Sequence, residues 1–419
     1  MSVIDLKYGR GSIAFDIDES RFRVLSREAS ALPLSDAEIG ERLDSPIASP
    51  GIGELIQPGQ TVLIVVPDAT REVGCGQVVN LLVRRLIADG VNAFDIRLIF
   101  ATGIHRKTTD AEKAAIVTPF IAQRIKMLDH DPRDLMQLTR LGETTGGIPI
   151  ELNRALVEHD HVILVGGVSF HYFAGFTGGR KLICPGLAST RTITGTHKLA
   201  FDSDRMDRRE GVGPARLDGN PVHNAFVEAA AAAPPSFAIT TVVNDLGEII
   251  DLYCGDWVRS HRAACDAFAE QNLTEITEKR GLVIAGCGGY PHDINMIQAH
   301  KALDTASKAC APGGTIILLA ECPDGLGRAD MIDWFNAADT AEMAARLGEK
   351  YQVNGQTAWS IKKKCEDFNV ILVSSLPPEL AEKMGMAPSG SLSDAIEKAA
   401  HWPSGYILTN GARTLIRAS

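Results

Sequence analysis

The chain has 419 residues, of which 45% are apolar and 22% charged, and its formal net charge is −10. This composition is typical of a globular, core-forming protein that is long enough for two domains. There is no basic run, no apolar stretch of membrane-spanning length and no signal-peptide pattern, so we expect no nucleic-acid or membrane partner and a cytoplasmic location.

Short apolar runs recur along the chain and predict buried strands. They are apolar throughout rather than alternating, as expected for parallel strands that helices cover on both faces. The runs are 61–68, 95–103, 161–167, 281–289, 314–321 and 369–375, with a weaker seventh at 405–411. Helical patterns lie between them, for example at 75–90 and 293–314. This alternation predicts an α/β fold with two α/β domains and largely parallel sheets.

The middle of the chain contains the expected division between these domains. The segment EAAAAAPPSF (228–237) predicts a helix that stops at a proline. LTEITEKR (273–280) then precedes a new strand. We therefore place an N-terminal domain at 1–272 and a C-terminal domain at 273–419.

The eight cysteines form no C-x-x-C pair, which argues against a zinc ribbon or a dithiol redox motif. In a long chain without a secretory signal, we expect reduced thiols. We interpret Cys184 as a buried packing residue rather than a nucleophile.

Polar residues gather directly after four of the predicted strands. The segments are PDATRE, TGIHRKTT, VSFHYFAGFTGGRK and GGYPHDINMIQAHK. Ligands of open α/β sheets bind outside the carboxyl ends of the strands. The sequence therefore predicts that these loops converge on one active-site cleft, which we place between the domains.

Three histidines in these contexts are candidates for chemistry. His105, His171 and His197 lie in TGIHRK, SFHYFAG and TGTHKL. Histidine can act as an acid, a base or a metal ligand near neutral pH. Any one of them alone is more often structural, and their spacing does not fit the helical H-E-x-x-H zinc motif.

A lysine follows two glycines in the segment SFHYFAGFTGGRKLICPG. Gly178 and Gly179 permit turns that other residues cannot adopt and a close approach of a ligand. Lys181 is then either a nucleophile in apolar surroundings or, with Arg180, part of an anion-binding loop. The residues alone do not decide between these two roles, and the spacing is not that of a Walker A motif.

Two further pairs have both a functional and a structural interpretation. Asp68 and Arg71 stand at a strand end, where the arginine either binds a carboxylate or phosphate or holds the turn. Gln298 and Lys301 share one helix face, which is either a binding surface or an ordinary solvated one.

Taken in order, these motifs resemble the nickel-pincer-nucleotide-dependent lactate racemase family. The resemblance rests on DATR, TGIHR, FHYFAGFTGGRKLICPG, GTH and Q-x-x-K, and covers most of the chain. Its most specific part is the spacing of His171, Lys181 and His197. Beyond about residue 310, little of the chain matches.

The resemblance implies a covalently bound cofactor. Lys181 would carry pyridinium-3,5-bisthiocarboxylic acid mononucleotide through a thioamide, and His197 would complete the coordination of nickel by its sulfurs and one ring carbon. His105 and His171 would be the acid–base catalysts. The remaining matches, near the cofactor or the substrate, are Asp68, Arg71, Gly178, Gly179, Gln298, Lys301 and, by a loose alignment, Trp359.

The implied activity is inversion of the C2 centre of a 2-hydroxy acid by hydride transfer to this cofactor and back. The implied partners are that small acid and the enzymes that make the cofactor. Ile297 stands where lactate-active relatives carry a bulky aromatic residue, which leaves room for another short-chain or larger 2-hydroxy acid, including an aldonic acid.

Two other functions are compatible with the same residues. A zinc-type metallohydrolase would hold its metal with His105, His171 and His197. A non-catalytic binder of an anionic metabolite would use Arg71, Lys181 and Lys301 as cationic contacts.

Overall fold

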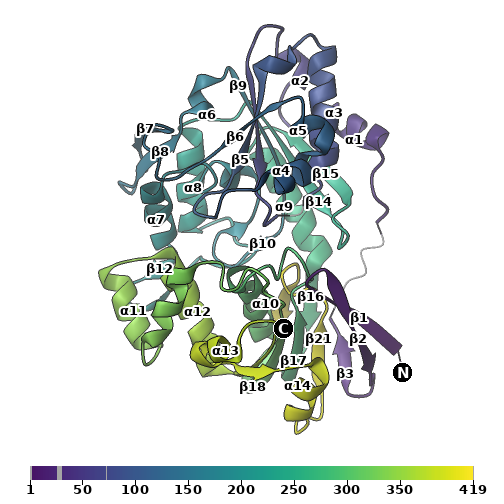
Figure 1. Ribbon diagram of the computed structural model, residues 1–419, viewed down its shortest axis with the longest axis vertical. Coiled ribbons are helices and arrows are strands. Elements are labelled where there is room, and N and C mark those ends of the chain that lie inside the picture. Colours follow the sequence, from purple (N-terminus) through teal and green to yellow (C-terminus); the bar gives the residue numbers. More distant parts are fainter. Residues whose placement is uncertain (1, 26–30, 72, 419) are drawn as a thin grey trace. The chain divides into compact units, whose positions relative to one another are not determined.

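The computed structural model describes residues 2–25, 31–71 and 73–418, which divide into two compact units (Figure 1). Unit 1 consists of Met1–Glu28, Phe201–Arg209 and Ala269–Ser419. Unit 2 consists of Ala29–Ala200 and Glu210–Phe268. Each unit contains one six-stranded, largely parallel sheet, so the predicted α/β class is confirmed.

The sheet of unit 2 has the strand order β15-β14-β9-β4-β5-β6, and only the β14–β15 pair is antiparallel. The strands are β4 (Val62–Pro67), β5 (Ile96–Ala101), β6 (Lys126–Asp129), β9 (His161–Gly167), β14 (Phe237–Val243) and β15 (Ile249–Gly255). Every residue of β4 is buried, which is why its sequence is apolar on both faces. Smaller antiparallel pairs are β7 (Leu138–Glu143) with β8 (Pro149–Asn153) and β10 (Phe170–His171) with β11 (Gly175–Phe176).

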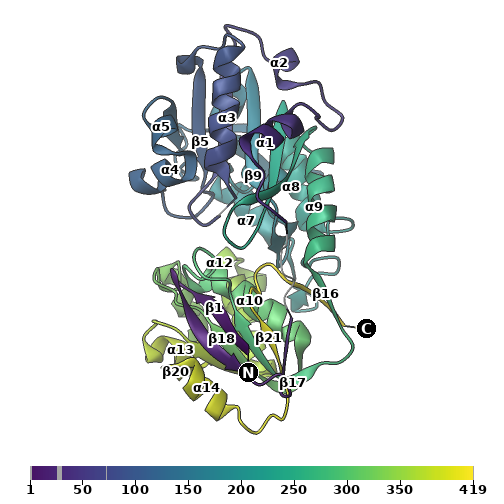
Figure 2. The same ribbon diagram turned by 90° about the vertical axis from the view of Figure 1, so that its right-hand side faces the viewer.

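Helices surround this sheet. They are α1 (Asp36–Leu43), α2 (Ile52–Leu55), α3 (Cys75–Ala88), α4 (Asp110–Val117), α5 (Pro119–Ala122), α6 (Ala155–Glu158), α7 (Thr190–Lys198), α8 (Pro221–Ala231) and α9 (Arg259–Asn272), with 3-10 turns η1 (Ala93–Asp95) and η2 (Gly179–Leu182). Figure 2 shows α3 running in the same direction as the strand labelled β5. Its buried stripe, which includes Val78, Leu82 and Leu86, packs in one hydrophobic cluster with strand residues of β4 and β5.

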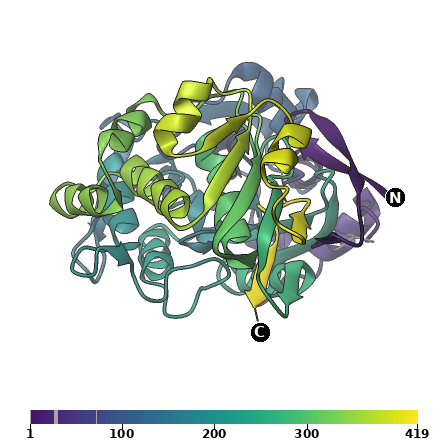
Figure 3. The ribbon, with the colours of Figure 1, turned by 90° about the horizontal axis from the view of Figure 1, so that it is seen from below.

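Unit 1 is built around the strand order β20-β19-β18-β17-β21-β3, with all neighbours parallel. Its strands are β1 (Ser2–Tyr8), β2 (Gly11–Ile17), β3 (Phe22–Val24), β12 (Phe201–Asp202), β13 (Asp207–Arg208), β16 (Leu273–Ile276), β17 (Arg280–Gly286), β18 (Cys310–Leu319), β19 (Asn369–Val373), β20 (Ala387–Ser389), β21 (Gly405–Leu408) and β22 (Leu415–Ala418). Its helices are α10 (Met296–Ala309), η3 (Ala329–Asn336), α11 (Thr340–Glu349), α12 (Val353–Asp367), α13 (Pro378–Met384) and α14 (Leu392–Lys398). Figure 3 shows the green and yellow-green strands of the six-stranded sheet side by side, with the yellow helices from the later part of the chain against them.

All seven predicted strands are present, within a few residues of the expected bounds. Both predicted helical patterns are confirmed as α3 and α10. The alanine-rich helix α8 ends at Ala231, before the two prolines that predicted its stop. Among the described residues, no helix is both long and apolar enough to cross a membrane.

The two units are interleaved along the chain. Unit 2 gives way to unit 1 at Phe268–Ala269, inside α9. Unit 1 also takes in the N-terminal residues and Phe201–Arg209, which a single cut after residue 272 places in the first domain. The domain boundary at 272/273, like an active-site cleft between the domains, stays a prediction.

A buried carboxylate anchors separate segments of unit 1 to one another. Asp304 on α10 is 4% exposed, and its Oδ1 lies 3.1 Å from both Arg208 Nη2 and Lys364 Nζ. Burial alone would raise the pKa of this carboxyl, but the two cations reverse the effect and hold the pKa far below its ordinary value. These two ion pairs therefore connect β13 and α12 to α10.

Replacing Asp304 should destabilise the protein strongly. In Asp304→Asn, Arg208 and Lys364 lose their buried counter-charge, so we expect the free energy of unfolding to fall by about 3–5 kcal/mol. Urea titration followed by circular dichroism would measure this. The control is Asp367→Asn, an exposed carboxylate on α12, which should stay within about 0.5 kcal/mol of wild type. Equal effects of the two substitutions would contradict the anchoring role.

Candidate functional site

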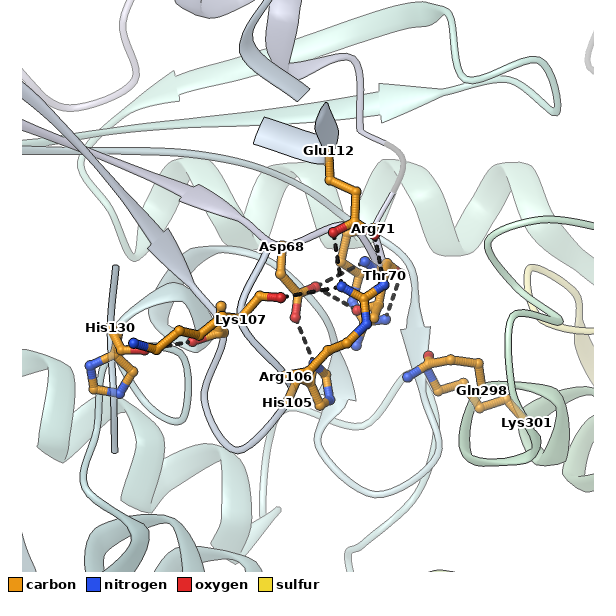
Figure 4. Close-up of polar contacts among 11 residues, drawn as sticks. Asp68, Thr70, Arg71, His105, Arg106, Lys107, Glu112, His130, Gln298 and Lys301 are labelled. Atoms are coloured by element: carbon orange, nitrogen blue, oxygen red, sulfur yellow. Dashed lines mark hydrogen bonds and ion pairs between the residues drawn. The ribbon is translucent and has the colours of Figure 1, made fainter. Parts of the chain in front are cut away.

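Two neighbouring strands of unit 2 bring a carboxylate and an imidazole together (Figure 4). Asp68 directly follows β4, and His105 lies four residues after β5, which pairs with β4 in parallel. His105 Nδ1 is 2.6 Å from Asp68 Oδ2. Because a carboxylate only accepts, the ring hydrogen is on Nδ1. In the neutral ring, Nε2 then carries a lone pair and can accept a proton.

The carboxyl of Asp68 is held as an anion by its surroundings. Its other oxygen accepts hydrogen bonds from Thr70 Oγ1 at 2.6 Å and Thr70 N at 3.0 Å. Burial would raise the pKa of this carboxyl, but His105, Arg71 and Thr70 together lower it to about 2. Asp68 is therefore ionised at neutral pH, where it orients His105 through their hydrogen bond.

Arg71 completes this turn. Its backbone N–H donates to Asp68 O at 3.2 Å, and its Nη1 donates to Thr70 O at 3.0 Å. Burial lowers the pKa of the guanidinium, whereas Asp68 acts in the opposite direction. These contacts agree with the structural interpretation, in which Asp68 and Arg71 hold the turn. The carboxylate-binding role of Arg71 stays a prediction.

The lysine segment depends on its two glycines. Gly178 and Gly179 have φ values of 73° and 51°, which favour glycine. A Cβ on Gly178 would lie 2.7 Å from Gly167 O, and one on Gly179 would lie 2.6 Å from ring atoms of His261. No other residue type fits this turn without displacing its neighbours, so the turn fixes where Lys181 leaves η2.

Two aromatic rings flank the amine of Lys181. Its Nζ lies 5.6 Å from the ring centre of Phe173 and 5.3 Å from that of Phe226. The same rings contact His197, with ring centres 5.1 Å and 5.5 Å away. Phe173 also meets His171 edge-on at 4.4 Å. The structure thus gathers three of the predicted residues around two phenylalanines.

His197 is a buried imidazole with a ring nitrogen that no described residue satisfies. It is 6% exposed near the end of α7, and its Nδ1 has no hydrogen-bond partner among the described residues. Burial, followed by the charge of Lys181, lowers its pKa to about 3, so the ring is neutral. A neutral imidazole with an unsatisfied nitrogen is a good ligand for a divalent transition metal.

His171 has the opposite tautomer from His105. Its Nδ1 accepts a hydrogen bond from Ala174 N at 3.2 Å, so in the neutral ring the hydrogen is on Nε2. In the neutral ring, Nε2 of His171 can therefore donate a hydrogen bond, whereas Nε2 of His105 can take a proton. Of these two rings, His105 is the one whose Nε2 can act as a base.

The three-histidine zinc site is not assembled. Within residues 2–25, 31–71 and 73–418, no group of three or more His, Cys, Asp or Glu side chains could hold a metal ion. Cys184 is fully buried, and burial raises its pKa to about 12, which fits a packing residue rather than a nucleophile.

The other candidates lie in unit 1. Asn295 caps α10 by accepting from Gln298 N at 3.1 Å, and Gln298 Oε1 accepts from Lys301 Nζ at 2.5 Å. The two side chains therefore act as one polar pair. Trp359 on α12 is buried edge-on against Phe201 at 5.4 Å, and Ile297 packs against the same core. Their predicted substrate-side roles stay predictions.

Sequence reasoning missed Phe173 and Phe226 as neighbours of the lysine. Phe173 stood inside the quoted motif, but an aromatic residue beside glycines gives no signal of what it packs against. Phe226 lies on the buried face of α8, where its pattern is that of any core residue.

The low pKa of Asp68 predicts that the protein loses stability at acidic pH. A carboxyl whose pKa is lowered from 3.8 to about 2 contributes stability above its ordinary pKa, and this contribution is lost as the pH falls through the folded value. At about 1.4 kcal/mol per pKa unit, wild type should lose about 2 kcal/mol more than Asp68→Asn as the pH falls towards 2. Urea titrations across this range would measure the difference. The exposed Asp89→Asn should follow wild type, and parallel curves for wild type and Asp68→Asn would refute the prediction.

Comparisons with known proteins agree with this architecture. Residues 8–208 match the model of the lactate racemase N-terminal domain, and residues 276–406 match that of the lactate racemase C-terminal domain. A lactate racemase of Lactiplantibacillus plantarum is 32% identical over 411 residues, covering 95% of each chain. A lactate racemase of Thermoanaerobacterium thermosaccharolyticum is 29% identical over 407 residues, covering 95% of this chain and 94% of the relative.

Solved structures give the same result. The lactate racemase apoprotein of Thermoanaerobacterium thermosaccharolyticum has a TM-score of 0.88 at 26% identity, covering 99% of this chain and 100% of that one. A Thermotoga maritima protein, at 20% identity and a TM-score of 0.72 over 92% of this chain and 99% of that one, shares the fold. The resemblance inferred from the motifs is confirmed: the chain belongs to the lactate racemase family.

Proposed function

We propose that this protein is a racemase or epimerase that inverts C2 of a 2-hydroxy acid with a nickel-pincer nucleotide attached to Lys181. The observation that carries the proposal is the arrangement around Phe173 and Phe226. These rings flank both the lysine amine and a buried, neutral histidine whose Nδ1 has no hydrogen-bond partner among the described residues.

The side chains present fit such a cofactor. The amine of Lys181 would provide the covalent attachment, and His197 would provide the protein ligand to nickel. The two phenylalanine rings offer an apolar wall for a flat ring. When bound, the cofactor supplies an acceptor for the hydrogen of the substrate's C2 as hydride.

The chain's own residues then manage the proton of the hydroxyl group. Loss of hydride from C2 requires that the hydroxyl lose its proton, because the product is a 2-keto acid. His105 would take this proton on Nε2, held in orientation by Asp68. His171 would donate a hydrogen bond from Nε2 on the opposite face. If C2 regained its hydrogen on the other face, the centre would be inverted and His105 would return its proton to the same oxygen.

Cationic side chains would hold the substrate's carboxylate. Arg71 offers a planar guanidinium beside Asp68 in unit 2. In unit 1, Gln298 orients the ammonium of Lys301 through their 2.5 Å hydrogen bond, and a substrate-side role of this pair is a separate prediction. Ile297 in place of an aromatic residue favours a 2-hydroxy acid other than lactate, for example a larger one such as an aldonic acid.

The attachment predicts a mass change on one peptide. When wild type is produced together with cofactor-biosynthesis enzymes, the peptide containing Lys181 should carry the added mass of the cofactor. Lys181→Arg keeps the positive charge but cannot form the thioamide, so it should lack both the adduct and racemase activity. Peptide mass spectrometry and chiral chromatography would measure the two. An active wild-type protein with an unmodified lysine would contradict the proposal.

The acid–base roles predict a loss of rate without a loss of cofactor. His105→Gln and His171→Gln should each lower kcat by about 10²–10⁴-fold, because the first removes the proton acceptor and the second removes the imidazole N–H that would face the substrate. A panel of enantiopure 2-hydroxy acids, followed by chiral chromatography, would measure this and identify the substrate. His401→Gln, an exposed histidine of unit 1, is the control and should be unchanged. A non-catalytic binder would show no racemisation with any acid.

A further inference from the structure

Arg180, next to the lysine, is the largest side chain that is almost fully buried, at 1% exposed. Its Nη2 donates to Ala174 O at 2.8 Å, and its Nη1 donates to Gly178 O at 3.4 Å. Among the ion pairs of the described residues, none joins Arg180 to a carboxylate. The backbone carbonyls of its own loop are therefore the main compensation for its charge.

The neighbours of Arg180 carry no negative charge. Burial raises the pKa of the Cys184 and Cys265 thiols to about 12, so both are neutral. Burial, followed by Arg180 itself, lowers the pKa of His261 to about 3, so this ring is also neutral. A buried cation in such surroundings holds nearby carbonyl dipoles firmly, since turning either one away would leave the charge unsatisfied. The guanidinium thus fixes the peptides at 174 and 178.

His261 supports the same turn from the helix α9. Its Nε2 is 2.8 Å from Thr177 O and 3.2 Å from Arg180 Nη1. A ring nitrogen cannot donate and accept at once, so the shorter contact assigns the hydrogen to Nε2 and the bond to Thr177 O. The ring also occupies the space where a Cβ of Gly179 would lie. It therefore blocks the turn from moving towards α9.

We propose that Arg180 and His261 form a clamp that positions Lys181 for attachment of its cofactor. The two side chains of the clamp hydrogen-bond to the carbonyls of residues 174, 177 and 178. The residues that follow form η2, which places the lysine amine between the rings of Phe173 and Phe226. Both are positioning residues, because neither would touch the reacting atoms. The role in attachment rests on the proposed function, whereas the placement of the amine does not.

A small pocket gives solutes access to this clamp. It measures about 80 Å³ and is lined by Arg180 and His261 together with His223, Trp257 and Arg262, among others. Truncation of Arg180 would enlarge it on the side of the loop. A guanidinium ion of the size of the lost group could then enter and bind the same carbonyls. This makes chemical rescue a direct test of the contact.

The test measures how exposed the amine of Lys181 becomes. Full-length protein without cofactor is treated with a trace of acetic anhydride, and acylation of Lys181 is compared with that of the exposed Lys198 by peptide mass spectrometry. In wild type, Lys181 should react more slowly than Lys198. In Arg180→Ala the turn should loosen, so acylation of Lys181 should rise severalfold. In separate preparations made with the biosynthesis enzymes, the yield of the cofactor adduct should fall severalfold.

Rescue separates positioning from a general loss of structure. Millimolar guanidinium chloride should restore the wild-type acylation rate in Arg180→Ala, and Arg180→Lys should retain it in part. If Arg180→Ala does not fold, His261→Ala tests the same clamp through the loss of the Thr177 contact. Arg262→Ala is the matched control, since this arginine lines the pocket but pairs with Asp218 and Asp266.

Two results would overturn the clamp. One is that Arg180→Ala or His261→Ala folds and keeps the wild-type acylation rate and adduct yield. The other is that the control Arg262→Ala changes the acylation rate and the adduct yield as much as Arg180→Ala or His261→Ala does. An absence of adduct on wild-type Lys181 would instead refute the proposed function, and the acylation rates would still decide on the clamp.

Discussion

The parallel pairing of β4 with both β5 and β9 is the constraint on which the candidate site of unit 2 depends. Parallel neighbours end at the same edge of a sheet, so the loops that follow them begin side by side. Asp68 comes from the first loop and His105 from the second, and the loop after β9 carries His171 and Lys181. Residues more than a hundred positions apart in the chain therefore begin from adjacent strand ends.

Burial then gives each of these side chains a defined charge. His197 is kept neutral by an apolar environment, whereas Asp68 is kept ionised because its partners outweigh the cost of burial. Arg180 keeps a positive charge without a carboxylate and is held by carbonyls instead. The same unit thus contains a neutral imidazole, a paired anion and a buried cation, each set by what surrounds it. Chemistry that requires distinct acids, bases and ligands needs this kind of separation.

Much of the fold could be predicted from the sequence because the central strands are apolar on both faces. Runs such as 61–68 and 161–167 have no other common explanation in a chain with helical patterns between them. The strands β14 and β15 were not predicted. β14 contains two adjacent threonines that interrupt its apolar run, and β15 lies at the sheet edge and mixes polar with apolar residues. The hairpin of β1 and β2 was missed for the same reason, since much of β2 faces solvent.

The candidate site was predictable as a set of loops but not as a set of contacts. The motif placed histidines and a lysine near glycines, and the structure adds which atoms face each other. The tautomers of His105 and His171 depend on single contacts, to a carboxylate and to a backbone N–H, that no pattern encodes. Arg180 illustrates the limit most clearly. The sequence offered it as part of an anion-binding loop with Lys181, and in the fold it is buried against the carbonyls of its own loop.

The pairing of β3 with β21 sets the order in which the protein can be completed on the ribosome. β3 lies within the first 25 residues, and its only neighbour in the sheet is formed by Gly405–Leu408. At about 5–20 residues per second, this segment waits roughly 20–80 s before its partner is synthesised. Unit 2, by contrast, has its whole chain available by Phe268. The lysine turn and its aromatic neighbours can thus take shape during translation, while the sheet of unit 1 closes only after Gly405–Leu408 has been synthesised.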